Sequence, residues 1–572
     1  MSRLSKPSHA WLAVAILLAG ALVFLPAVRA PLWLDDYVQA SMVDGSFPAA
    51  RGPTGLYDFV GDDDRKALMD RGILPWWSNP RLKVRFFRPL SSALLFAEHR
   101  LTSHAPLPLH LASLAWWAAA VLAARSLYRR VLPERASTLA MAVFALAPCH
   151  ALPLAWVANR EVLMSLAFGA AALGLLARSR TAPTWGGFLG ATALFSLSLA
   201  SGEYGVCFGG YVLAFELSRP GSRWKKLPGL LAFALPAAAY LSVRAALHYG
   251  AAGSGFYHDP LRTPGAFLQA APRRLITLLA DGWLTANADD WASEAPLWLL
   301  AALLACALLF FARPLRTAMR AAGAPAQRDL RWLAAGSLLA LVPVLAAAPS
   351  SRLIAVSVLG TAPLVAALID HAWLSGAASV LPDQRLRLAA IALGFLHLVH
   401  GPAISWFTSR ALQATSVESA ASARWLRDRI GDTSAAGVVV TRAAWQSVGP
   451  LAVDPPRVPA RWRVLVIARH ALALRTNDRT LEVVIPRGEG FYPAGSNDLF
   501  RSDDDPIRTG DEVDVPGMHV TVVDAGISGP ARMRFVFDRS LDDPSLTWVA
   551  QTAATYKSSS PPGVGFGARL DP

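Results

Sequence analysis

Charged residues are scarce in this sequence. Of its 572 residues only 16% are Asp, Glu, Lys or Arg, whereas 54% are hydrophobic and the mean hydropathy is +0.36. A soluble globular domain usually carries about 25% charged residues. The composition therefore argues against a single soluble enzyme, and it excludes intrinsic disorder of the chain as a whole.

Cysteine is also rare, and its three copies have no paired spacing. Cys149, Cys207 and Cys306 all lie in or beside apolar runs. Neither a disulfide framework nor a Cys-x-x-Cys metal site can be built from them. We expect all three to pack as small buried hydrophobic residues.

The sequence has no Lys/Arg tract, no zinc-finger spacing and no internal repeat, so neither a nucleic-acid partner nor a repeat array is expected. From residue 408 onward there are 19 Lys and Arg and 19 Asp and Glu, so the whole net charge of +14 lies before that point. A basic excess spread over short loops between apolar runs is typical of membrane topology.

The sequence contains many long apolar runs. Eleven runs of about 15 to 22 residues are candidate membrane spans. The sequence therefore predicts a mainly α polytopic membrane protein with about 11 transmembrane helices, a count that the short run 204–218 leaves open by one. The runs are 10–28, 107–127, 136–158, 161–177, 185–201, 204–218, 227–247, 296–312, 330–348, 353–373 and 386–407.

Basic residues are unevenly distributed among the connecting loops. With the N-terminus in the cytoplasm, 19 Lys and Arg lie near inner loops and only five in the opposite short loops. This asymmetry predicts a bacterial inner-membrane protein whose residues after 407 lie in the periplasm. Arg3 and Lys6 before the first apolar run would also fit a cleavable signal peptide, which leaves the downstream topology unchanged.

We predict three regions along the chain. Residues 1–407 form the transmembrane domain, with long outer loops at 29–106 and 248–295. Residues 408–556 form a periplasmic, mainly β soluble domain, because short alternating segments there are separated by turn residues. Residues 557–572 are rich in Ser, Pro and Gly and predict a disordered tail.

Local patterns refine these regions. Amphipathic stretches at 86–101 and 267–284 predict interfacial helices in the outer loops, and 418–430 predicts one helix in the last domain. The pair Trp76 and Trp77 is interpreted as part of an aromatic belt at the membrane interface. Strands are predicted at 436–441, 463–468, 481–486, 518–523 and 533–538.

Two adjacent carboxylates follow the first apolar run, in the segment Trp33-Leu34-Asp35-Asp36-Tyr37. Near a membrane boundary such a pair has three common uses. It begins a solvated loop, holds a cation, or acts as a general base on a lipid-borne substrate. The spacing alone leaves all three alternatives open.

Further motifs follow this pair in a definite order. With it, the motifs are Trp33–Tyr37, Phe86-Phe87-Arg88-Pro89-Leu90, Leu109-His110-Leu111, Phe144–Arg160, Leu199–Glu203 and Ser350–Ile354. Together they resemble the GT-C superfamily of polyprenol-linked glycosyltransferases, in particular the protein O-mannosyltransferase-like branch that includes the tetratricopeptide-containing mannosyltransferases. The likeness covers roughly residues 10–407 and none of the β domain.

The pattern of that branch reads W-x-D-D, R-P-L, H-L-x-N, F-A-L-H-P-x-H-x-E-x-V-A-W-V-x-x-R, S-K-E and E-R-Y-L-Y. The missing Glu at position 152 removes an acidic metal ligand, for which Glu161 or Glu203 could substitute. The four departures are Ala147 for His, Leu152 for Glu, Ser113 for Asn and Gly202 for Lys.

The resemblance implies a glycosyltransferase that moves a sugar, with inversion, from a polyprenyl-phosphate donor to a periplasmic protein, lipid or polysaccharide. Asp35 or Asp36 would be the general base, and a divalent cation (Mg or Mn) stays open because some relatives need one. Always-charged arginines suit the donor phosphate, and the candidates are Arg88, Arg160 and Arg352. Supporting acid/base or acceptor roles fall to His110, His150, Glu161, Glu203, Asp289 and Asp290.

Two other classes of protein remain as alternatives. A transporter or flippase of lipid-linked sugars would need charged residues along a path through the bilayer, and the interiors of the apolar runs carry few, with Arg244 as the nearest candidate. A non-catalytic glycan-binding scaffold would explain the missing His and Glu. Donor consumption by the purified protein distinguishes the scaffold from an enzyme.

Overall fold

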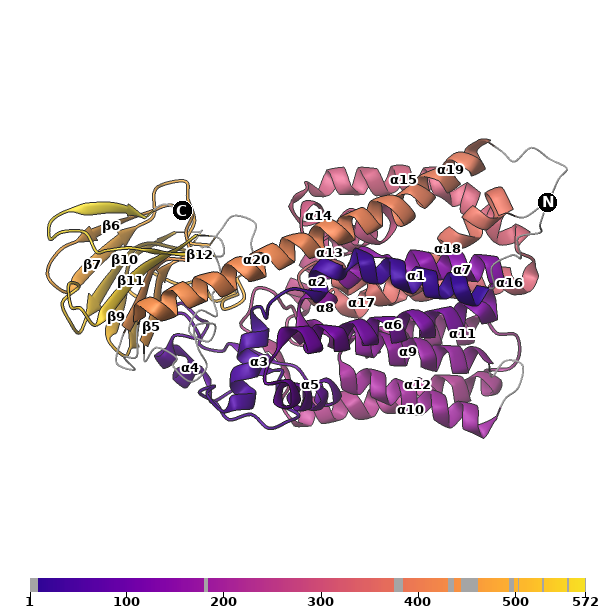
Figure 1. The fold of residues 1–572 in the computed structure, drawn as a ribbon, viewed down its shortest axis with the longest axis horizontal. Coiled ribbons are helices and arrows are strands. Elements are labelled where there is room, and N and C mark those ends of the chain that lie inside the picture. Colours follow the sequence, from indigo (N-terminus) through magenta and orange to yellow (C-terminus); the bar gives the residue numbers. More distant parts are fainter. Residues whose placement is uncertain are drawn as a thin grey trace.

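The computed structural model describes residues 9–178, 184–374, 384–430, 437–443, 461–492, 498–502, 504–526, 529–552 and 555–570. These residues form a helical bundle and a β-rich domain, and a single long helix, α20 (Gly401–Ile430), runs out of the bundle to the β domain (Figure 1). The helices of the long outer loops, among them α3 (Asp35–Asp44), α4 (Arg65–Arg71) and α5 (Pro89–Thr102), lie at the end of the bundle that faces the β domain (Figure 1).

Each of the eleven predicted apolar runs is helical, although several are broken into shorter pieces. The bundle helices are α1 (His9–Val23), α2 (Leu25–Val28), α6 (Pro106–Val131), α7 (Glu134–Ala145), η1 (Pro148–His150), α8 (Ala151–Ala155), η2 (Val157–Asn159), α9 (Glu161–Arg178), α10 (Trp185–Ser201), α11 (Tyr204–Ser218), α12 (Arg223–Ala246), α15 (Leu297–Ala321), α16 (Ala324–Leu339), α17 (Leu341–Val344), η3 (Ser351–Ile354), α18 (Ala355–Ile369), η4 (Asp370–Leu374), α19 (Gln384–Phe395) and η5 (Leu396–His400).

Six helices of the described residues are long and apolar enough to cross a membrane. A seventh is added if Glu134–Ala145 and Pro148–Ala155, which are bent by 49° at their junction, count as one span. The helices at 185–201 and 204–218 have 17 and 15 residues, which is shorter than the roughly 20 residues that a span needs. The prediction of a mainly helical polytopic membrane protein is confirmed, whereas the count of eleven transmembrane helices is not.

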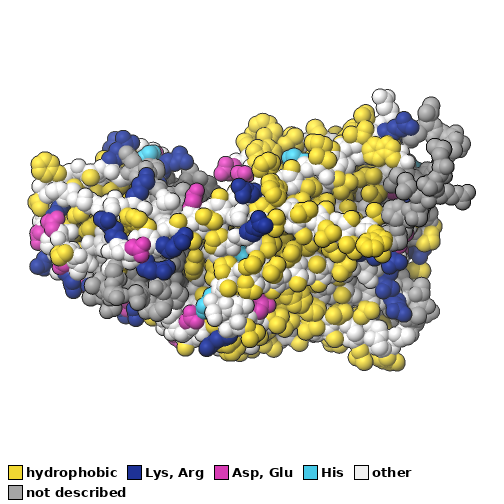
Figure 2. All heavy atoms as spheres, in the orientation of Figure 1, with side chains coloured by type: hydrophobic (Ala, Val, Ile, Leu, Met, Phe, Trp, Pro, Cys, Tyr) yellow, Lys and Arg dark blue, Asp and Glu magenta, His cyan; other side chains and the backbone are white. Residues whose placement is uncertain are grey.

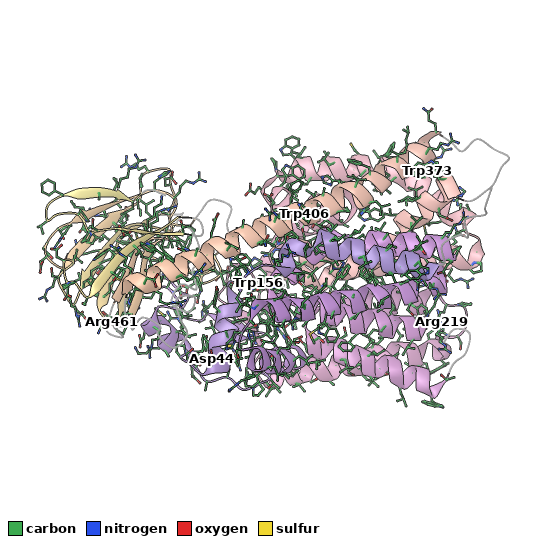
Figure 3. All side chains as sticks on the ribbon, viewed as in Figure 1. Asp44, Trp156, Arg219, Trp373, Trp406 and Arg461 are labelled. Atoms are coloured by element: carbon green, nitrogen blue, oxygen red, sulfur yellow. The ribbon has the colours of Figure 1, made fainter. Side chains whose placement is uncertain are left out.

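The outer surface of the bundle is apolar. Figure 2 shows hydrophobic side chains over its flank, with charged side chains gathered on the β domain and at the opposite end, where Figure 3 places Arg219. Trp298 and Leu309 on α15 are each more than two-thirds exposed, as expected for side chains that face lipid. The prediction that all three cysteines are buried is wrong for Cys306, because it lies on this exposed helix.

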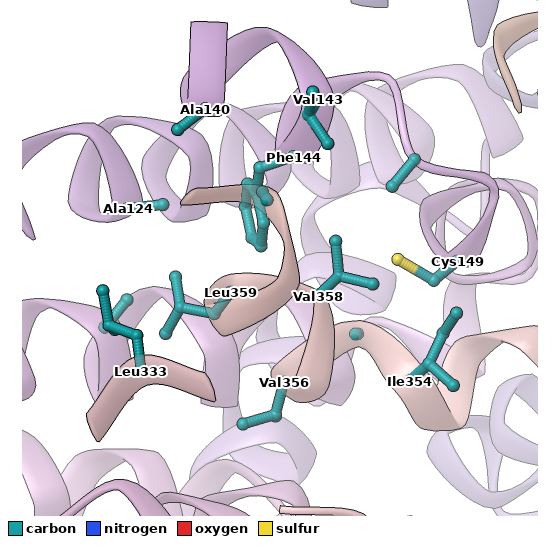
Figure 4. Close-up of a cluster of buried hydrophobic side chains, with 14 of the residues drawn as sticks. Ala124, Ala140, Val143, Phe144, Cys149, Leu333, Ile354, Val356, Val358 and Leu359 are labelled. Atoms are coloured by element: carbon teal, nitrogen blue, oxygen red, sulfur yellow. The ribbon is translucent and has the colours of Figure 1, made fainter. Parts of the chain in front are cut away.

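The core of the bundle is centred on α18, in which every residue is buried. Figure 4 shows Val356, Val358 and Leu359 of this helix packed among side chains of neighbouring helices. Gly360 allows a close approach, since a Cβ there would lie 2.3 Å from the Leu333 carbonyl oxygen. The tight packing fixes the short η3 turn that directly precedes α18.

The β domain contains two sheets. One has the strand order β13-β6-β7-β10-β9-β8, and the other has the order β12-β11-β4-β5 with β4 parallel to both of its neighbours. All five predicted strands are confirmed. The strands are β4 (Gly437–Arg442), β5 (Arg461–Val466), β6 (Ala471–Arg475), β7 (Thr480–Val484), β8 (Glu512–Val515), β9 (Met518–Gly526), β10 (Gly529–Phe537), β11 (Leu546–Thr552), β12 (Thr555–Ser558) and β13 (Gly567–Leu570).

Two predicted boundaries differ from the structure. α20 continues through residue 407 without a break, so the bundle and the predicted helix at 418–430 belong to one element. β13 lies inside the predicted disordered tail and pairs with β6 in an antiparallel ladder. The backbone hydrogen bonds of this ladder order the segment, which composition alone did not indicate.

The two outer loops fold together. Strands β1 (Asp58–Val60) and β2 (Lys83–Arg85) from the first loop form a sheet with β3 (Gly250–Ala252) from the second. Both predicted amphipathic helices are present, as α5 and α13. The outer helices are α3 (Asp35–Asp44), α4 (Arg65–Arg71), α5 (Pro89–Thr102), α13 (Pro264–Leu284) and α14 (Trp291–Glu294).

The first outer loop packs directly against the β domain. Trp76 donates to the Leu465 carbonyl at 3.1 Å, and Trp77 donates to Asp498 at 3.2 Å. Both indoles are buried and contact the Phe491 ring. The interpretation of this pair as a membrane belt is wrong, because the β domain offers the rings both apolar surroundings and hydrogen-bond acceptors.

Candidate active site

A cavity of about 560 Å³ lies where the bundle, the outer loops and the β domain meet. Most of its lining side chains are apolar or aromatic, and Trp156, labelled in Figure 3, marks the bundle side of it. An apolar chamber with a few convergent polar groups is the usual form of a ligand site. Its charged and hydroxyl-bearing lining residues are Asp35, Asp289, Ser350, Arg352, Thr408 and Tyr257.

Asp35 is the first residue of α3 and lines the cavity. Leu34 before it has φ 47° and ψ −116°, a strained conformation for a residue with a Cβ. Within the described residues, the Asp35 carboxylate accepts no hydrogen bond. Burial raises the pKa of Asp35 to about 6, although the charges of Arg352 and Arg88 act in the opposite direction.

Asp36 has a different environment from its neighbour. It is fully buried, and its carboxylate accepts hydrogen bonds from the Trp33 amide at 2.9 Å and the Ala158 amide at 2.7 Å. Burial raises the pKa of Asp36 to about 7, and these backbone donors oppose that shift. Asp36 fastens α3 to the turn η2 and is not among the residues that line the cavity.

Arg352 supplies the positive charge of the cavity. It lies in η3, donates to the Asn159 side chain, and has its guanidinium 5.5 Å from the Trp156 ring centroid. Its Nε is buried without a hydrogen-bond partner, and no carboxylate in the described part of the chain forms an ion pair with it. A guanidinium held in this way is suited to bind a phosphate.

The second outer loop holds the turn that carries Arg352. Asp289 accepts a hydrogen bond from the Ser351 amide at 3.0 Å, and the Ala288 amide donates to the Ser351 hydroxyl at 3.1 Å. Asp289 and Asp290 are both exposed, but only Asp289 lines the cavity.

Asp281 on α13 supports this arrangement without lining the cavity, and no sequence motif pointed to it. It is 2% exposed, accepts from the Asn287 amide at 3.1 Å, and keeps its second oxygen without a partner. Burial raises the pKa of Asp281 to about 6. The signal was present, because a carboxylate between Leu278-Leu279-Ala280 and Gly282-Trp283-Leu284 is as unusual as the glutamates that were singled out.

Arg88 belongs to a charged cluster that adjoins the cavity, because its charge and that of Glu161 both act on Asp35. Its Nε donates to Glu203 at 2.7 Å and its Nη1 to Glu161 at 3.0 Å. The rings of Tyr57 and Phe86 flank the guanidinium at 4.8 and 4.5 Å. The cluster joins the start of α5 to α9 and to the turn before α11, and none of its three charged residues lines the cavity.

Arg160 is buried between α5 and α6, apart from the two groups described above. It donates to the Ser113 hydroxyl at 2.9 Å, to the Glu98 carboxylate and to the Leu109 carbonyl. These partners engage all three of its guanidinium nitrogens. Arg160 therefore connects α5, α6 and the start of α9, away from the cavity lining.

The two predicted histidines are buried within the bundle. His110 has its Nδ1 2.9 Å from the Leu154 carbonyl oxygen, and His150 has its Nε2 2.9 Å from the Phe144 carbonyl oxygen. Neither lines the cavity. The structure thus brings Asp35, Asp289 and Arg352 together in the cavity lining and leaves the other predicted site residues outside it, with Arg88 and Glu161 near enough for their charges to act on Asp35.

Two observations bear on a divalent cation. Leu152, which stands where the resembling pattern has Glu, lines the cavity, so an apolar side chain occupies that place. Among the residues that the structure describes, no three His, Cys, Asp or Glu side chains converge in a way that could hold a metal ion. The donor set does not fit a cation held by the protein alone.

No protein-family model matches the sequence, and no curated protein matches it. Among solved structures, the chain is similar to ArnT from Cupriavidus metallidurans bound to undecaprenyl phosphate. The sequence identity is 14%, the TM-score is 0.45, and the match covers 80% of this chain and 86% of that one.

Two other solved structures are similar at the same level. One is the oligosaccharyltransferase AglB from Archaeoglobus fulgidus with an inhibitory peptide and dolichol-phosphate, at 14% identity, a TM-score of 0.44, and coverage of 80% of this chain and 65% of that one. The other is the arabinofuranosyltransferase AftD from Mycobacteria, at 16% identity, a TM-score of 0.36, and coverage of 81% and 33%. Similarity of this degree assigns neither an activity nor a ligand to this chain.

Proposed function

We propose that this protein is a GT-C-like membrane glycosyltransferase that transfers a sugar from a polyprenyl-phosphate donor to an acceptor on the extracytoplasmic side. The observation that carries the proposal is the meeting of Asp35 and Arg352 in one largely apolar cavity at the end of a membrane-spanning bundle. A carboxylate and a guanidinium are the two groups that such a reaction needs. The sequence motifs around both residues supply the donor class.

Asp35 is the general base of the proposed reaction. The acceptor hydroxyl attacks the anomeric carbon of the donor sugar while its proton passes to the Asp35 carboxylate. The bond between that carbon and the phosphate oxygen breaks, and polyprenyl phosphate leaves with the electron pair. A base with a pKa near 6 is mostly ionised at pH 7 and still accepts a proton, which is the useful range for this role.

Arg352 stabilises the departing phosphate. Its charge is not neutralised by an ion pair in the described residues, and its side chain lines the cavity. Donors fixed in a place that excludes water are worth more than the same donors in water. Asp289 and Ser351 hold the turn, so the guanidinium needs little rearrangement when the donor binds.

The membrane orientation is part of the proposal. The β domain and Arg219 lie at opposite ends of the bundle (Figure 3), and basic residues favour the cytoplasmic side. We place the β domain and the cavity in the periplasm and the N-terminus in the cytoplasm. Alkaline phosphatase fused after residue 570 would then be active in bacterial cells. An inactive fusion would indicate that the protein has the opposite orientation.

The test of the function measures release of polyprenyl phosphate from a radiolabelled sugar donor by the purified chain in nanodiscs. We expect Asp35→Asn to reduce release by about 10²- to 10⁴-fold, the usual contribution of a positioned base. Asp514→Asn, at an exposed β-domain carboxylate, serves as the matched control and keeps the wild-type rate. Equal rates for wild type and Asp35→Asn would contradict the assignment, as would movement of label across vesicles without bond cleavage.

A further inference from the structure

The β domain has a pocket of its own, and three arginines line it. Arg461 and Arg463 come from β5, and Arg539 follows the end of β10. None of the residues that line this pocket also lines the candidate active site, and none of them is acidic. Figure 3 places Arg461 on the β domain, apart from the bundle. We call the pocket that these three side chains line the arginine pocket.

The geometry of β5 brings two of the arginines together. Arg461 and Arg463 are two positions apart, so their side chains leave the same face of the strand. Arg463 donates to the Pro516 carbonyl at 2.8 Å. An Arg461 nitrogen lies 2.8 Å from the position that a Cβ on Gly517 would take. Both guanidinium groups therefore reach the turn between β8 and β9.

Arg539 is held at the same place by the start of β4. Its Nη1 donates to the Ser545 hydroxyl at 2.7 Å, and the Ser545 carbonyl accepts from the Gly437 amide at 3.0 Å. Gly437 in turn pairs with Arg461 in the parallel ladder of β4 and β5. Because Gly437 has no side chain, β4 does not cover Arg461 at this position.

The fold uses only part of this positive charge. Arg463 is 6% exposed and donates to the Asp70 carbonyl of α4 at 2.9 Å, so it joins β5 to the first outer loop. Arg539 is exposed, and the hydrogen bond to Ser545 engages only one of its nitrogens. Arg461 forms no hydrogen bond and no ion pair in the part of the chain that the structure describes. No contact within the fold therefore accounts for the charge of Arg461.

No carboxylate neutralises the arginine pocket. The charge of Asp70 acts on Arg463, and the charge of Arg539 acts on Asp543. Neither pair is close enough for an ion pair, and within the described ranges none of the three arginines forms one. Burial and the neighbouring charge of Arg461 lower the pKa of Arg463 to about 10. Like charges that the fold fixes side by side repel each other, and a bound anion removes this repulsion.

We propose that the arginine pocket binds a phosphate group of a soluble ligand, either inorganic phosphate or a phosphate ester. Guanidinium groups present several N–H donors in a planar fork that matches phosphate oxygens, and three positive charges suit a dianion better than a single carboxylate. A lipid headgroup is a less suitable source, since the pocket lies on the β domain and not on the bundle that the bilayer surrounds (Figure 3). The inference does not depend on the proposed glycosyl transfer.

The experiment titrates the full chain, in nanodiscs of phosphatidylcholine, with inorganic phosphate and separately with glycerol 3-phosphate, and it measures the heat of binding. The buffer contains little salt, because salt screens ionic contacts. We expect saturable binding of inorganic phosphate at one site per chain. Binding of glycerol 3-phosphate as well would extend the ligand to phosphate esters, whereas binding of inorganic phosphate alone would restrict it to the free ion.

Variants of the pocket locate the binding. Arg461→Gln removes a guanidinium group that the fold does not use, so we expect a normally folded variant whose affinity for phosphate is lower by about tenfold or more. Arg539→Gln, at an exposed position, should act in the same direction. Arg487→Gln is the matched control, because it removes the same charge from an exposed position of the β domain outside the pocket and should keep the wild-type affinity. Thermal unfolding without phosphate should give the same Tm for Arg461→Gln and Arg487→Gln.

Four results would overturn the inference. A wild-type chain that gives no saturable heat has no phosphate site. Equal affinities of Arg461→Gln and Arg487→Gln would place the binding outside the arginine pocket. Acetate that binds as tightly as phosphate would make the pocket a site for anions in general. Displacement of inorganic phosphate by phosphatidic acid added to the nanodisc lipids would show that a lipid headgroup is the ligand.

Discussion

Asp35 and Asp36 are adjacent in sequence but differ in what they can do. Asp35 faces the cavity without a hydrogen-bond donor, whereas Asp36 is saturated by two backbone amides. A carboxylate that accepts two backbone N–H groups outside the cavity lining is a structural anchor and does not meet an acceptor in the cavity. The geometry therefore gives Asp35 the proposed role in the reaction and Asp36 a structural role.

The pH dependence of transfer follows from the pKa of Asp35, which burial raises to about 6. The base works when ionised, so we expect the rate to rise with pH and to level off above an apparent pKa near 6. Arg352 lowers the pKa of Asp35, so Arg352→Gln should move this limb to higher pH in addition to slowing the reaction. A rate that is constant between pH 5 and 8 would contradict the role of Asp35.

Asp36→Asn should act on stability. An amide keeps one acceptor oxygen but turns an NH₂ group toward a backbone amide, leaving a buried donor unsatisfied at a cost of about 1–3 kcal/mol. We expect a lower Tm for Asp36→Asn and an unchanged Tm for Asp35→Asn, measured by thermal unfolding in the same detergent. The reverse order of the two Tm values would exclude this division of roles.

At the scale of elements, the site depends on how the first outer loop is joined to the β domain. α4 ends at Gly72, which has φ +80° and lies so close to β5 that a Cβ would be 1.9 Å from the Trp462 carbonyl oxygen. The position requires glycine for its backbone conformation and for the close approach.

Gly72→Ala should weaken this junction more than a matched change does. Gly45 ends α3 with a similar φ of +76°, but no atom lies within 4 Å of the place that a Cβ would take, so Gly45→Ala bears only the left-handed penalty of about 1–2 kcal/mol. Gly72→Ala adds a clash worth roughly 1–3 kcal/mol. Limited proteolysis should release the β domain faster from Gly72→Ala, and equal rates for both variants would show that the junction tolerates a side chain.

Element positions were largely predictable from the sequence because they depend on local periodicity. Alternation at 518–523 and 533–538 sufficed to find β9 and β10, and the apolar run at 353–373 sufficed to find α18. The ends and breaks of helices were not predictable from the sequence, because tertiary packing determines them. The run at 330–348 is divided between α16 and α17, and α20 has no break at 407.

At the scale of the whole molecule, the structure adds contacts that no local pattern contains. Trp77 meets Asp498 across 421 positions of sequence, and β2 joins β3 across a long gap between two loops. Through these contacts, the two outer loops and the β domain together form one wall of the cavity. Periodicity cannot reveal such pairings, since they depend on tertiary packing.

The candidate site was predictable only in part for the same reason. Motif order pointed to Asp35 and Arg352, which the structure places in one cavity, and equally to Arg88 and Arg160, which form ion pairs outside the cavity lining. All three arginines lie outside helix interiors near the same end of the bundle, so the sequence offers no way to rank them. Only their partners distinguish them.

The central claim is that Asp35 and Arg352 act on one ligand in one cavity. A double-mutant cycle with Asp35→Asn, Arg352→Gln and the combined variant, each assayed for kcat/KM of polyprenyl phosphate release, tests it most directly. Residues that act together on one transition state are not additive, so the account predicts that the combined variant loses much less than the product of the two single losses. A combined loss within about twofold of that product, as for independent sites, would contradict it.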